Sequence, residues 1–492
     1  MKSKTFKPSR KSKAKEDTPP NSAESLYIQA TEEEGFGDRW LASDLAKALR
    51  FYQRAYSLYL ESLQLQTDYL DSRYNVSRLL FFVYDRYVKN EAVVLDELEN
   101  CSEALTGTAS SVVRPLRDII QVFQESIQIS RTAAYFPWDL FYNAVLCFFE
   151  YMEELVKNGD SFSELVSCGE ECLGLLRKVL GHQMTELAAL TSPEETQVVA
   201  QEHEYETQQE AIVPPTVLET CVTGYRIIAT LYEGAVSEDE RALVELKFAD
   251  AAQELEKMVS ALVEQYSAPV NDFIPPLSSD DLGQLQLTKL CYEAAKADSF
   301  DTLFDIWRGS QSVEKLLLEN ESYRTLLAKK DHIPAATRWT VLSSISNRYK
   351  EAFELLKQEY NQLRKTATNS QLGSKLAQMC SILIERADVD LERSQTPTLE
   401  DKTRSLLATN ANKLLRNAIT YSQQSGGLRE SVLEKLARRK KLKEASTRLC
   451  ILEGKTSIEE LDKIVGRPFW PQELHELGDL GIYNVDSLER AI

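Results

Sequence analysis

The sequence predicts an all-helical protein, and three observations favour that class. Apolar residues recur at the spacing of one helix face over most of the chain. Glycine and proline, which interrupt helices, number only 18 and 15 among 492 residues. Hydrophobic residues make up 43% of the chain, and its length exceeds one ordinary core. We therefore expect several packed helical units.

The stretch from Asp44 to Lys89 carries the clearest helical pattern. Its first half places one apolar stripe on a helix face, consisting of Leu45, Ala48, Leu49, Tyr52, Ala55, Tyr56, Tyr59 and Leu63. Its second half repeats the pattern with Val76, Leu79, Leu80, Val83 and Tyr87. We expect two amphipathic helices joined by a short polar turn. The small Ala48 and Ala55 flank the large Tyr52, so a neighbouring helix can approach closely while the ring fills the gap.

This stretch resembles the tetratricopeptide repeat, a helix pair of about 34 residues. One set of residues matches the small–large–small pattern of that family's second helix, and another matches the aromatic–Asn core of its first helix. The matching residues are Ala48, Tyr52, Ala55, Phe123, Ala411, Leu415 and Ala418 for the former, and Tyr74, Asn75, Tyr142 and Asn143 for the latter. The resemblance implies a right-handed solenoid of antiparallel helix pairs. The alternative is an irregular helical bundle with chance matches.

Composition divides the chain into segments. The first repeat has a turn enlarged by the sequence from Gly35 to Trp40, and Ser278 or Ser279 is expected to cap a helix. The C-terminus reads as helix, glycine turn and helix, a hairpin that would cap the solenoid. The expected segments are a disordered basic tail at 1–21, tetratricopeptide-like repeats at 22–183, an acidic Glu/Gln-rich linker at 184–213, a helical hairpin continuing the solenoid at 214–265, a Pro-rich linker at 266–281, a second helical repeat region at 282–426, and a basic helix with a C-terminal helical cap at 427–492.

The charge is unevenly distributed. The formal net charge is −19, whereas the first 17 residues hold seven Lys or Arg and two Asp or Glu, so the tail carries +5 and the remainder −24. An acidic body should repel nucleic acid and attract basic polypeptides. The alternative is that the charge serves solubility alone.

Three charged clusters are candidate binding or targeting sites. A candidate import signal consists of Arg10, Lys11, Lys13 and Lys15, and the alternatives are a solvated arm or a weak RNA contact. A candidate client-binding segment without Lys or Arg holds Glu194, Glu195, Glu202, Glu204, Glu206 and Glu210. A candidate basic patch, which would contact RNA, act as a second import signal or simply be solvated, holds Lys435, Arg438, Arg439, Lys440, Lys441 and Lys443.

Motifs for catalysis and cofactor binding are incomplete. Gly454-Lys455-Thr456 resembles the end of a phosphate-binding loop, but Leu449 stands where the first glycine is required. His475-Glu476 has no second His of a zinc protease. The eight cysteines are scattered among apolar residues and are interpreted as small buried hydrophobes. We therefore expect no catalytic residue, metal or cofactor, and no small-molecule substrate.

The predicted function is protein binding without catalysis. No apolar run approaches the roughly 20 residues that span a bilayer, and no signal peptide is evident, so we expect no membrane association and an intracellular chain. Together with the candidate import signal, this predicts a location in the nucleus and cytoplasm. The first hypothesis is an acidic escort for a basic nuclear client, such as a ribosomal protein or histone. The second is an adaptor subunit of a multiprotein complex. The third is an RNA-associated factor in ribosome biogenesis or translation. Direct nucleic-acid binding is a weaker alternative than protein binding.

The candidate client-binding segment can be tested directly. Replacing its six glutamates with glutamine should weaken capture of a basic client, because exposed charges act over about 8 Å at physiological ionic strength and about 3 Å at 1 M salt. Affinity purification of parent and variant across a salt series measures the effect. Equal client recovery at every salt concentration would exclude this segment as the client site.

Overall fold

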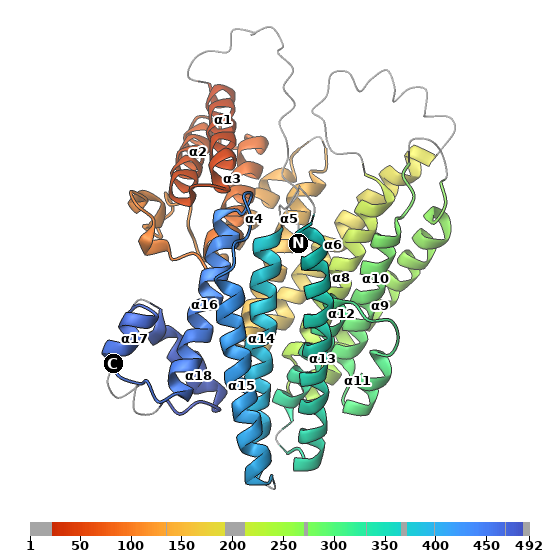
Figure 1. Ribbon diagram of the computed structural model, residues 1–492. Coiled ribbons are helices and arrows are strands. Elements are labelled where there is room, and N and C mark those ends of the chain that lie inside the picture. The colour runs from red at the N-terminus through yellow and green to blue at the C-terminus, as the bar shows by residue number, and fades with distance from the viewer. Residues whose placement is uncertain are drawn as a thin grey trace. The chain divides into compact units, whose positions relative to one another are not determined.

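The chain folds into helices, as the sequence predicts (Figure 1). The computed structural model describes residues 22–133, 135–191, 212–269, 274–330, 332–365, 371–397, 399–467 and 469–485. Over these ranges it is 78% helical, with 17 α-helices packed in neighbouring pairs and no strand. The all-α prediction is therefore confirmed. The chain divides into two compact units, with α1 to α10 in unit 1 and α11 to α18 in unit 2.

Unit 1 is a series of helices in which each packs on the next. Its α-helices are α1 (Ala23–Leu41), α2 (Leu45–Leu65), α3 (Leu70–Val83), α4 (Leu116–Ser130), α5 (Trp138–Asn158), α6 (Phe162–Thr191), α8 (Pro214–Gly234), α9 (Glu238–Tyr266) and α10 (Ser279–Lys296). A π-turn, Tyr84–Val88, continues α3, and two short 3-10 turns, Leu95–Glu97 and Ser102–Leu105, precede α4.

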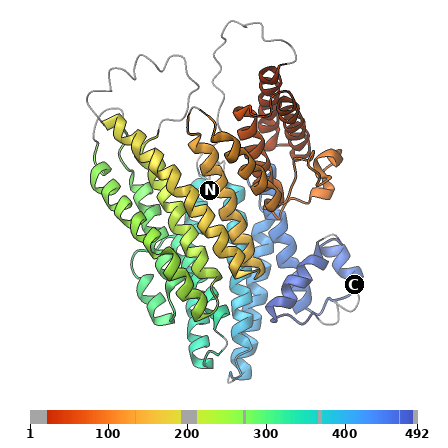
Figure 2. The same cartoon turned by 180° about the vertical axis from the view of Figure 1, so that it is seen from behind.

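Alternate helices of unit 1 also touch. In addition to the neighbouring pairs, α3 packs on α5, α5 on α8, and α8 on α10. Figure 2 shows these helices running side by side through the unit. Contacts of this kind arise when helix pairs stack so that the first helix of each pair meets the first helix of the next. We call α1, α3, α5 and α8 the first helices of unit 1.

The pairing of α1 with α2 depends on a ring packed against a glycine. Tyr52 of α2 is fully buried, and a Cβ atom added to Gly37 of α1 would overlap its ring. The ring hydroxyl donates to Asp38 Oδ1 at 3.0 Å, so it also has a polar partner. Gly35–Trp40 therefore lies inside α1 and not in an enlarged turn, which corrects the sequence interpretation. Gly37 allows close helix packing, since the absence of a Cβ atom lets the backbone approach the ring.

The predicted stripes of α2 and α3 are buried. Both alanines around Tyr52 have no exposed surface, and the stripe residues of α3 are buried in the same way. Leu63 is half-buried, because it lies in the last turn of α2. Helices α2 and α3 do not form an isolated hairpin, because α2 also packs on α1. The stripe pattern was therefore sufficient to locate the core of this part of unit 1.

Local capping agrees with the sequence at the start of α10. The backbone N–H of Asp281 donates to Ser278 Oγ at 3.1 Å, and the backbone N–H of Ser278 donates to Asp281 Oδ2 at 2.9 Å. This reciprocal pair satisfies two donors that the first helical turn leaves without helix partners. The predicted cap at Ser278 is therefore present.

Unit 2 has a core of four long helices. Its helices are α11 (Phe300–Ile306), α12 (Val313–Lys329), α13 (Ala335–Leu363), α14 (Leu372–Ser394), α15 (Asp401–Ser422), α16 (Val432–Leu452), α17 (Ile458–Ile464) and α18 (Trp470–Leu480). Helix α14 packs on α13, α15 and α16, so it lies at the centre of the unit. The repeat-like residues Ala411, Leu415 and Ala418 of α15 are fully buried.

Two boundaries differ from those expected. Helix α6 continues to Thr191, past the expected start of the acidic linker at 184, because its apolar residues keep the spacing of a helix. The compact units divide after Lys296 rather than within 266–281. Helix α10 packs on α8, which joins it to unit 1. A proline-rich connection therefore need not mark the edge of a packed unit.

All eight cysteines are thiols, and six of them are buried. Burial raises the pKa of Cys221 and of Cys380 to about 12, because a thiolate is poorly solvated in an apolar core. Burial also raises the pKa of the half-buried Cys168 to about 11. The six buried cysteines pack as small hydrophobes, as expected. No helix in the described ranges combines the length and apolar character required to cross a membrane.

Truncating Tyr52 should destabilise unit 1. We expect Tyr52→Ala to lower the free energy of unfolding by about 3–5 kcal/mol, because a fully buried ring is lost and a cavity is left against Gly37. Urea denaturation followed by circular dichroism measures the change. The control is Leu246→Ala at an 83% exposed position of α9, which should change stability by less than about 0.5 kcal/mol. Parent-like unfolding of Tyr52→Ala would contradict the packing described.

Candidate protein-binding surfaces

The same short sequence pattern stands at the start of two first helices. Asp-x-x-Tyr-Asn occupies residues 71–75 in α3 and 139–143 in α5. In both helices the aspartate lies in the first turn, where the helix dipole favours a negative charge. Because the pattern sits at the same place in both helices, its side chains occupy equivalent positions along unit 1.

Each asparagine of the pattern bonds back to a tyrosine of the preceding first helix. Asn75 Nδ2 donates to Tyr27 Oη of α1 at 3.3 Å. Asn143 Nδ2 donates to Tyr74 Oη of α3 at 3.4 Å and to the Asp139 carbonyl at 2.8 Å. We call this series the tyrosine–asparagine ladder. The predicted repeat-packing residues Asn75 and Asn143 are therefore both half-buried or buried hydrogen-bonding residues between helices.

Further polar contacts extend the ladder along unit 1. Tyr142 Oη and Thr223 Oγ1 of α8 lie 3.1 Å apart. Arg78 Nε donates to Asn75 Oδ1 at 3.1 Å, and its guanidinium pairs with Glu34 of α1. Helices α1, α3, α5 and α8 are thus joined by side-chain hydrogen bonds on one side. Mutually satisfied polar groups of this kind fix how the helices lie against one another.

The aspartates of the pattern differ from Glu34 because no cation pairs with them in the described part of the chain. Burial raises the pKa of Asp71. Burial also raises the pKa of Asp139, and the negative charge of Asp71 raises it further, although hydrogen bonds from the Leu140 backbone and the Tyr74 hydroxyl lower it in part. The two carboxylates are therefore close together, partly desolvated and electrostatically uncompensated.

Tyrosine rings surround these carboxylates. The Tyr27 and Tyr69 ring centroids are 5.6 Å apart and meet edge to face. Burial raises the pKa of Tyr135, and the charges of Asp71 and Asp139 raise it further, so Tyr135 lies near both carboxylates. Its side chain is still 51% exposed. We call this group the tyrosine–aspartate cluster, and it consists of Tyr27, Tyr69, Asp71, Tyr74, Tyr135 and Asp139.

The cluster has the chemistry of a site for a cationic side chain. A guanidinium or ammonium group would neutralise the carboxylates and lie against ring faces, and partial desolvation strengthens both interactions. The resemblance to the repeat family includes the Tyr-Asn part of the pattern but not the aspartates. The signal that would have found them is the repetition of Asp four residues before each Asn.

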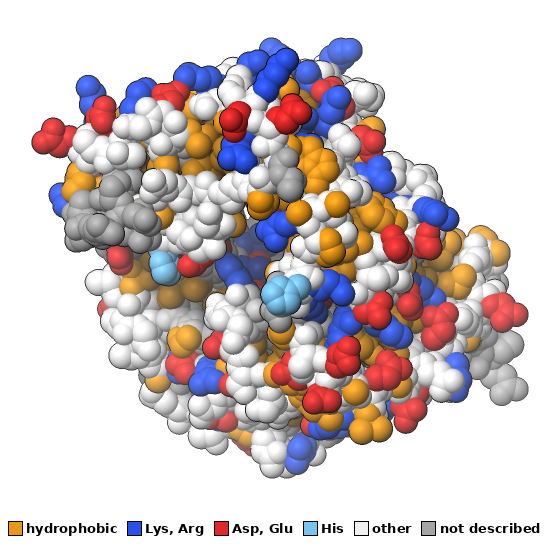
Figure 3. Space-filling model, turned by 90° about the horizontal axis from the view of Figure 1, so that it is seen from below, with side chains coloured by type: hydrophobic (Ala, Val, Ile, Leu, Met, Phe, Trp, Pro, Cys, Tyr) orange, Lys and Arg blue, Asp and Glu red, His pale blue; other side chains and the backbone are white. Residues whose placement is uncertain are grey.

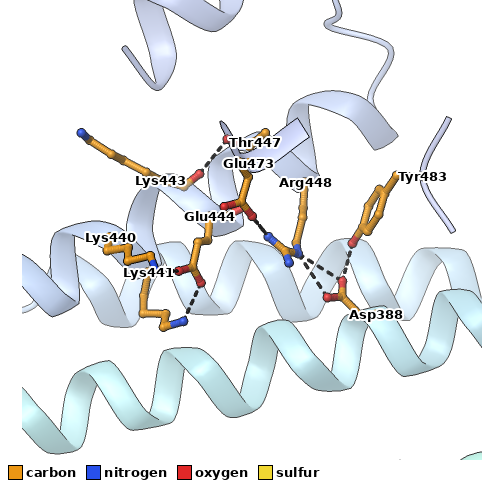
Figure 4. Close-up of polar contacts among 9 residues, drawn as sticks. All are labelled: Asp388, Lys440, Lys441, Lys443, Glu444, Thr447, Arg448, Glu473 and Tyr483. Atoms are coloured by element: carbon orange, nitrogen blue, oxygen red, sulfur yellow. Dashed lines mark hydrogen bonds and ion pairs between the residues drawn. The ribbon is translucent and has the colours of Figure 1, made fainter. Parts of the chain in front are cut away.

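The predicted basic patch on α16 is divided by acidic partners. Lys441 Nζ lies 2.7 Å from Glu444 Oε2, and Lys440 Nζ lies 3.7 Å from Glu444 Oε1 (Figure 4). Lys443 Nζ is 5.3 Å from the Phe469 ring centroid. Three of the predicted cations therefore have partners within unit 2.

A fourth cation of the patch is inside the fold. Arg438 is buried and forms a bidentate ion pair with Glu430, with Nε 2.8 Å from Oε1 and Nη2 3.0 Å from Oε2. Its Nη1 also donates to the Ser422 carbonyl. Lys435 and Arg439 remain exposed. The six cations therefore do not form one continuous basic surface on α16.

A buried ion cluster one turn further along α16 holds the C-terminal elements of unit 2. Arg448 Nε lies 3.2 Å from Asp388 Oδ2 of α14, and Arg448 Nη1 pairs with Glu473 of α18 (Figure 4). The Tyr483 hydroxyl donates to Asp388 Oδ1 at 2.5 Å. All four side chains are buried. We call this group the Arg448 cluster.

The Arg448 cluster balances two buried acids against one base. Burial raises the pKa of Asp388 and of Glu473, and the Arg448 charge partly offsets the effect in each. Although burial alone would lower the pKa of Arg448, the charges of Asp388 and Glu473 raise it overall. The charged groups of the cluster pair with one another. The cluster therefore accounts for the attachment of α18 to α14 and α16 better than it accounts for ligand binding.

Two candidate sites lie outside the described residues. They are the candidate import signal at Arg10, Lys11, Lys13 and Lys15, and the candidate client-binding glutamates Glu194, Glu195, Glu202, Glu204, Glu206 and Glu210. Among the residues that are described, no group of three or more His, Cys, Asp or Glu side chains has a metal-binding arrangement.

Comparison with known proteins gives distant similarity without a stated function. Residues 311–471 match a family model described as the YNL193W C-terminal domain. The chain is also 24% identical over 518 residues to a protein of Saccharomyces cerevisiae named uncharacterized protein YNL193W, covering 87% of this chain and 89% of that protein. No solved structure matches the chain. The matched C-terminal region contains Asp388 and Arg448, whereas Glu473 and Tyr483 follow it.

Removing the cation of the Arg448 cluster should destabilise unit 2. We expect Arg448→Met to lower the free energy of unfolding by about 3–5 kcal/mol at neutral pH, because two buried carboxylates lose their only guanidinium partner in the cluster. Their folded-state pKa values then rise further, so the folded state takes up protons more readily than the unfolded state. The loss should therefore shrink as pH falls from about 7 to about 5.

Arg439→Met on the exposed face of α16 is the matched control, and it should change stability by less than about 0.5 kcal/mol at either pH. Denaturant unfolding at both pH values measures the two variants. An Arg448→Met loss that does not depend on pH would contradict the assigned electrostatics.

Proposed function

We propose that this chain is a non-enzymatic helical-repeat scaffold that binds a basic polypeptide. In this proposal unit 1 is a right-handed solenoid similar to tetratricopeptide repeats, and the C-terminal helices form a cap. The observation that carries the proposal is the tyrosine–aspartate cluster, where Asp71 and Asp139 lack a cation among the described residues and stand among exposed or half-exposed rings. A Lys or Arg side chain of a client supplies the missing charge.

The ladder supports the repeat part of the proposal. Asn75 and Asn143 make the same bond to the tyrosine of the preceding first helix, and they are 68 residues apart, twice the period of about 34 residues. Alternate helices also touch in the order expected of stacked pairs. A repeat scaffold uses its row of first helices to bind extended peptides, so the position of the cluster on α1, α3 and α5 agrees with a client-binding surface.

The net charge supports a basic client over an acidic one. The chain carries −19 overall, and a negative surface accelerates encounter with a positive partner. The escort function, with a ribosomal protein or histone as client in nucleus and cytoplasm, is the specific form of the proposal. Its acidic character would mask the positive charge of such a client until assembly.

The second candidate function is that of an adaptor subunit. Figure 3 shows Lys and Arg side chains interspersed with Asp and Glu over the face in view, and many carboxylates of both units are paired with cations within their own unit. Such mixed charge favours solubility and apolar or shape-based contacts over attraction of one highly charged client. Affinity purification with mass spectrometry at low and high salt distinguishes the two functions. Partners lost at high salt favour the escort, whereas partners retained favour the adaptor.

Neutralising the two aspartates should impair client binding without harming the fold. We expect Asp71→Asn with Asp139→Asn to weaken binding of a fluorescein-labelled oligolysine peptide about tenfold, or about 1.4 kcal/mol. Stability should stay the same or increase slightly, because uncompensated, partly desolvated charges are removed. Fluorescence anisotropy and urea denaturation of the full chain measure the two effects.

The same site gives binding a defined pH dependence. Because burial raises the pKa of Asp71 and of Asp139, these carboxyls take up protons at higher pH than ordinary aspartates, and the protonated forms attract no cation. Binding should therefore weaken as pH falls from about 7 to about 5. The matched control is Asp96→Asn with Asp250→Asn, which removes the same charge from exposed positions of unit 1. Equal weakening by both double variants would exclude the cluster as the client site.

A further inference from the structure

The outer surface of the α1–α2 hairpin combines exposed aromatic rings with cations. Phe36 is 38% exposed and Trp40 is 37% exposed, although large aromatic side chains are usually covered in a folded protein. They lie four residues apart on α1, which places them about 6 Å apart along the helix axis on the same face. Phe51 of α2 continues this surface, since its ring centroid is 5.6 Å from that of Phe36.

A cation lies over each of these rings. The Arg39 guanidinium carbon is 5.1 Å from the centroid of Phe36, and the Arg54 guanidinium carbon is 5.5 Å from the centroid of Phe51. Lys47 Nζ is 3.4 Å from the centroid of Trp40. We call this group the ring–cation surface, and it consists of Phe36, Arg39, Trp40, Lys47, Phe51 and Arg54.

The two arginines have no carboxylate partner in the part of the chain that the structure describes. Arg39 and Arg54 are both exposed, so their donors face solvent. The rings hold the guanidinium groups in place by cation–π attraction and so reduce the entropy lost when an anion binds. This arrangement contrasts with α16, where Arg438 and Lys441 have their charges paired with Glu430 and Glu444.

The position of the surface in the fold leaves it accessible within unit 1. Helix α1 is the first described helix and packs on α2, at one end of the helix series of the unit (Figure 1). The sequence that leads into α1 carries +5 over its first 17 residues. Between that stretch and Arg39 the charged residues are Glu24, Glu32, Glu33, Glu34 and Asp38, so the positive charge of the surface comes from its own three cations. At physiological ionic strength charges act over about 8 Å, so carboxylates farther away than this have little effect on these cations.

We propose that the ring–cation surface binds single-stranded RNA. Alternating cations and aromatic rings match the alternating phosphates and bases of a single strand, because guanidinium groups pair with phosphates while bases stack on rings or on guanidinium planes. A purely acidic peptide would use the cations but would have no bases to stack on the exposed rings of Phe36 and Trp40. A duplex presents its phosphates but keeps its bases stacked inside. The surface therefore fits a single strand better than either alternative, and this binding is separate from that of a basic client at the tyrosine–aspartate cluster.

The test measures binding of the full chain to a fluorescein-labelled oligouridylate of about 15 nucleotides by fluorescence anisotropy. Arg39→Gln with Arg54→Gln should weaken binding about fivefold to tenfold at about 0.2 M salt. The slope of log affinity against log salt should fall by about 1.4, since two phosphate contacts are lost at about 0.7 each. Both positions are exposed, so the melting temperature of the variant should match that of the parent.

The control removes two equally exposed cations elsewhere. Lys435→Gln with Arg439→Gln on α16 changes the net charge by the same amount, and it should leave RNA affinity within about twofold of the parent. A stacking readout is provided by Trp40, whose fluorescence should be quenched by RNA. Trp40→Phe should remove that quenching while keeping most of the affinity, because a ring is retained.

Four results would overturn the proposal. The first is no anisotropy change with the oligouridylate at low salt. The second is equal weakening by both double variants, which would show that only net charge matters. The third is binding of a labelled oligoglutamate peptide in preference to RNA, with the same dependence on Arg39 and Arg54, which would identify an acidic polypeptide as the partner. Equal affinity for a duplex of the same length would likewise exclude single-strand recognition.

Discussion

The hydrogen bond from an asparagine to a tyrosine of the preceding first helix is the interaction on which the arrangement of unit 1 depends. Asn75 and Asn143 each donate a hydrogen bond to a tyrosine hydroxyl between two first helices. Such a hydroxyl is costly to bury without a partner, so the bond favours one angular position of each helix against the next. Apolar stripes bring the helices together without specifying that position closely, because hydrophobic contact has no preferred direction.

The ladder also explains why the candidate client site exists where it does. When the Tyr-Asn pair turns inward to bond with the preceding helix, the aspartate one helical turn earlier is held beside it. Asp139 therefore lies beside Tyr74, and its hydrogen bond with that hydroxyl supports its position. The same local geometry at α3 places Asp71 near Asp139. A pattern that serves packing thus also places two negative charges next to each other.

The sequence was most informative where a structure follows from periodicity alone. The buried stripe around Tyr52 and the buried residues Ala411, Leu415 and Ala418 were predictable because each depends only on neighbours along one helix. It was least informative where a partner is distant in the chain. The neutralisation of Lys441 is local, but Arg448 meets Asp388 from 60 residues away, and no spacing rule shows such a pair. Gly35–Trp40 was misread for the same reason, because the need for Gly37 arises on α2.

The buried cysteines have a practical consequence for observing this protein at work. A thiolate is the form that reacts with maleimide dyes, and the raised pKa of Cys221 or Cys380 leaves little of that form at neutral pH. A single new cysteine at an exposed site, such as Asp250 on α9, would react much faster than these native thiols. Dyes can therefore be attached to chosen helices with the core cysteines left in place, which opens distances within each unit to fluorescence measurement.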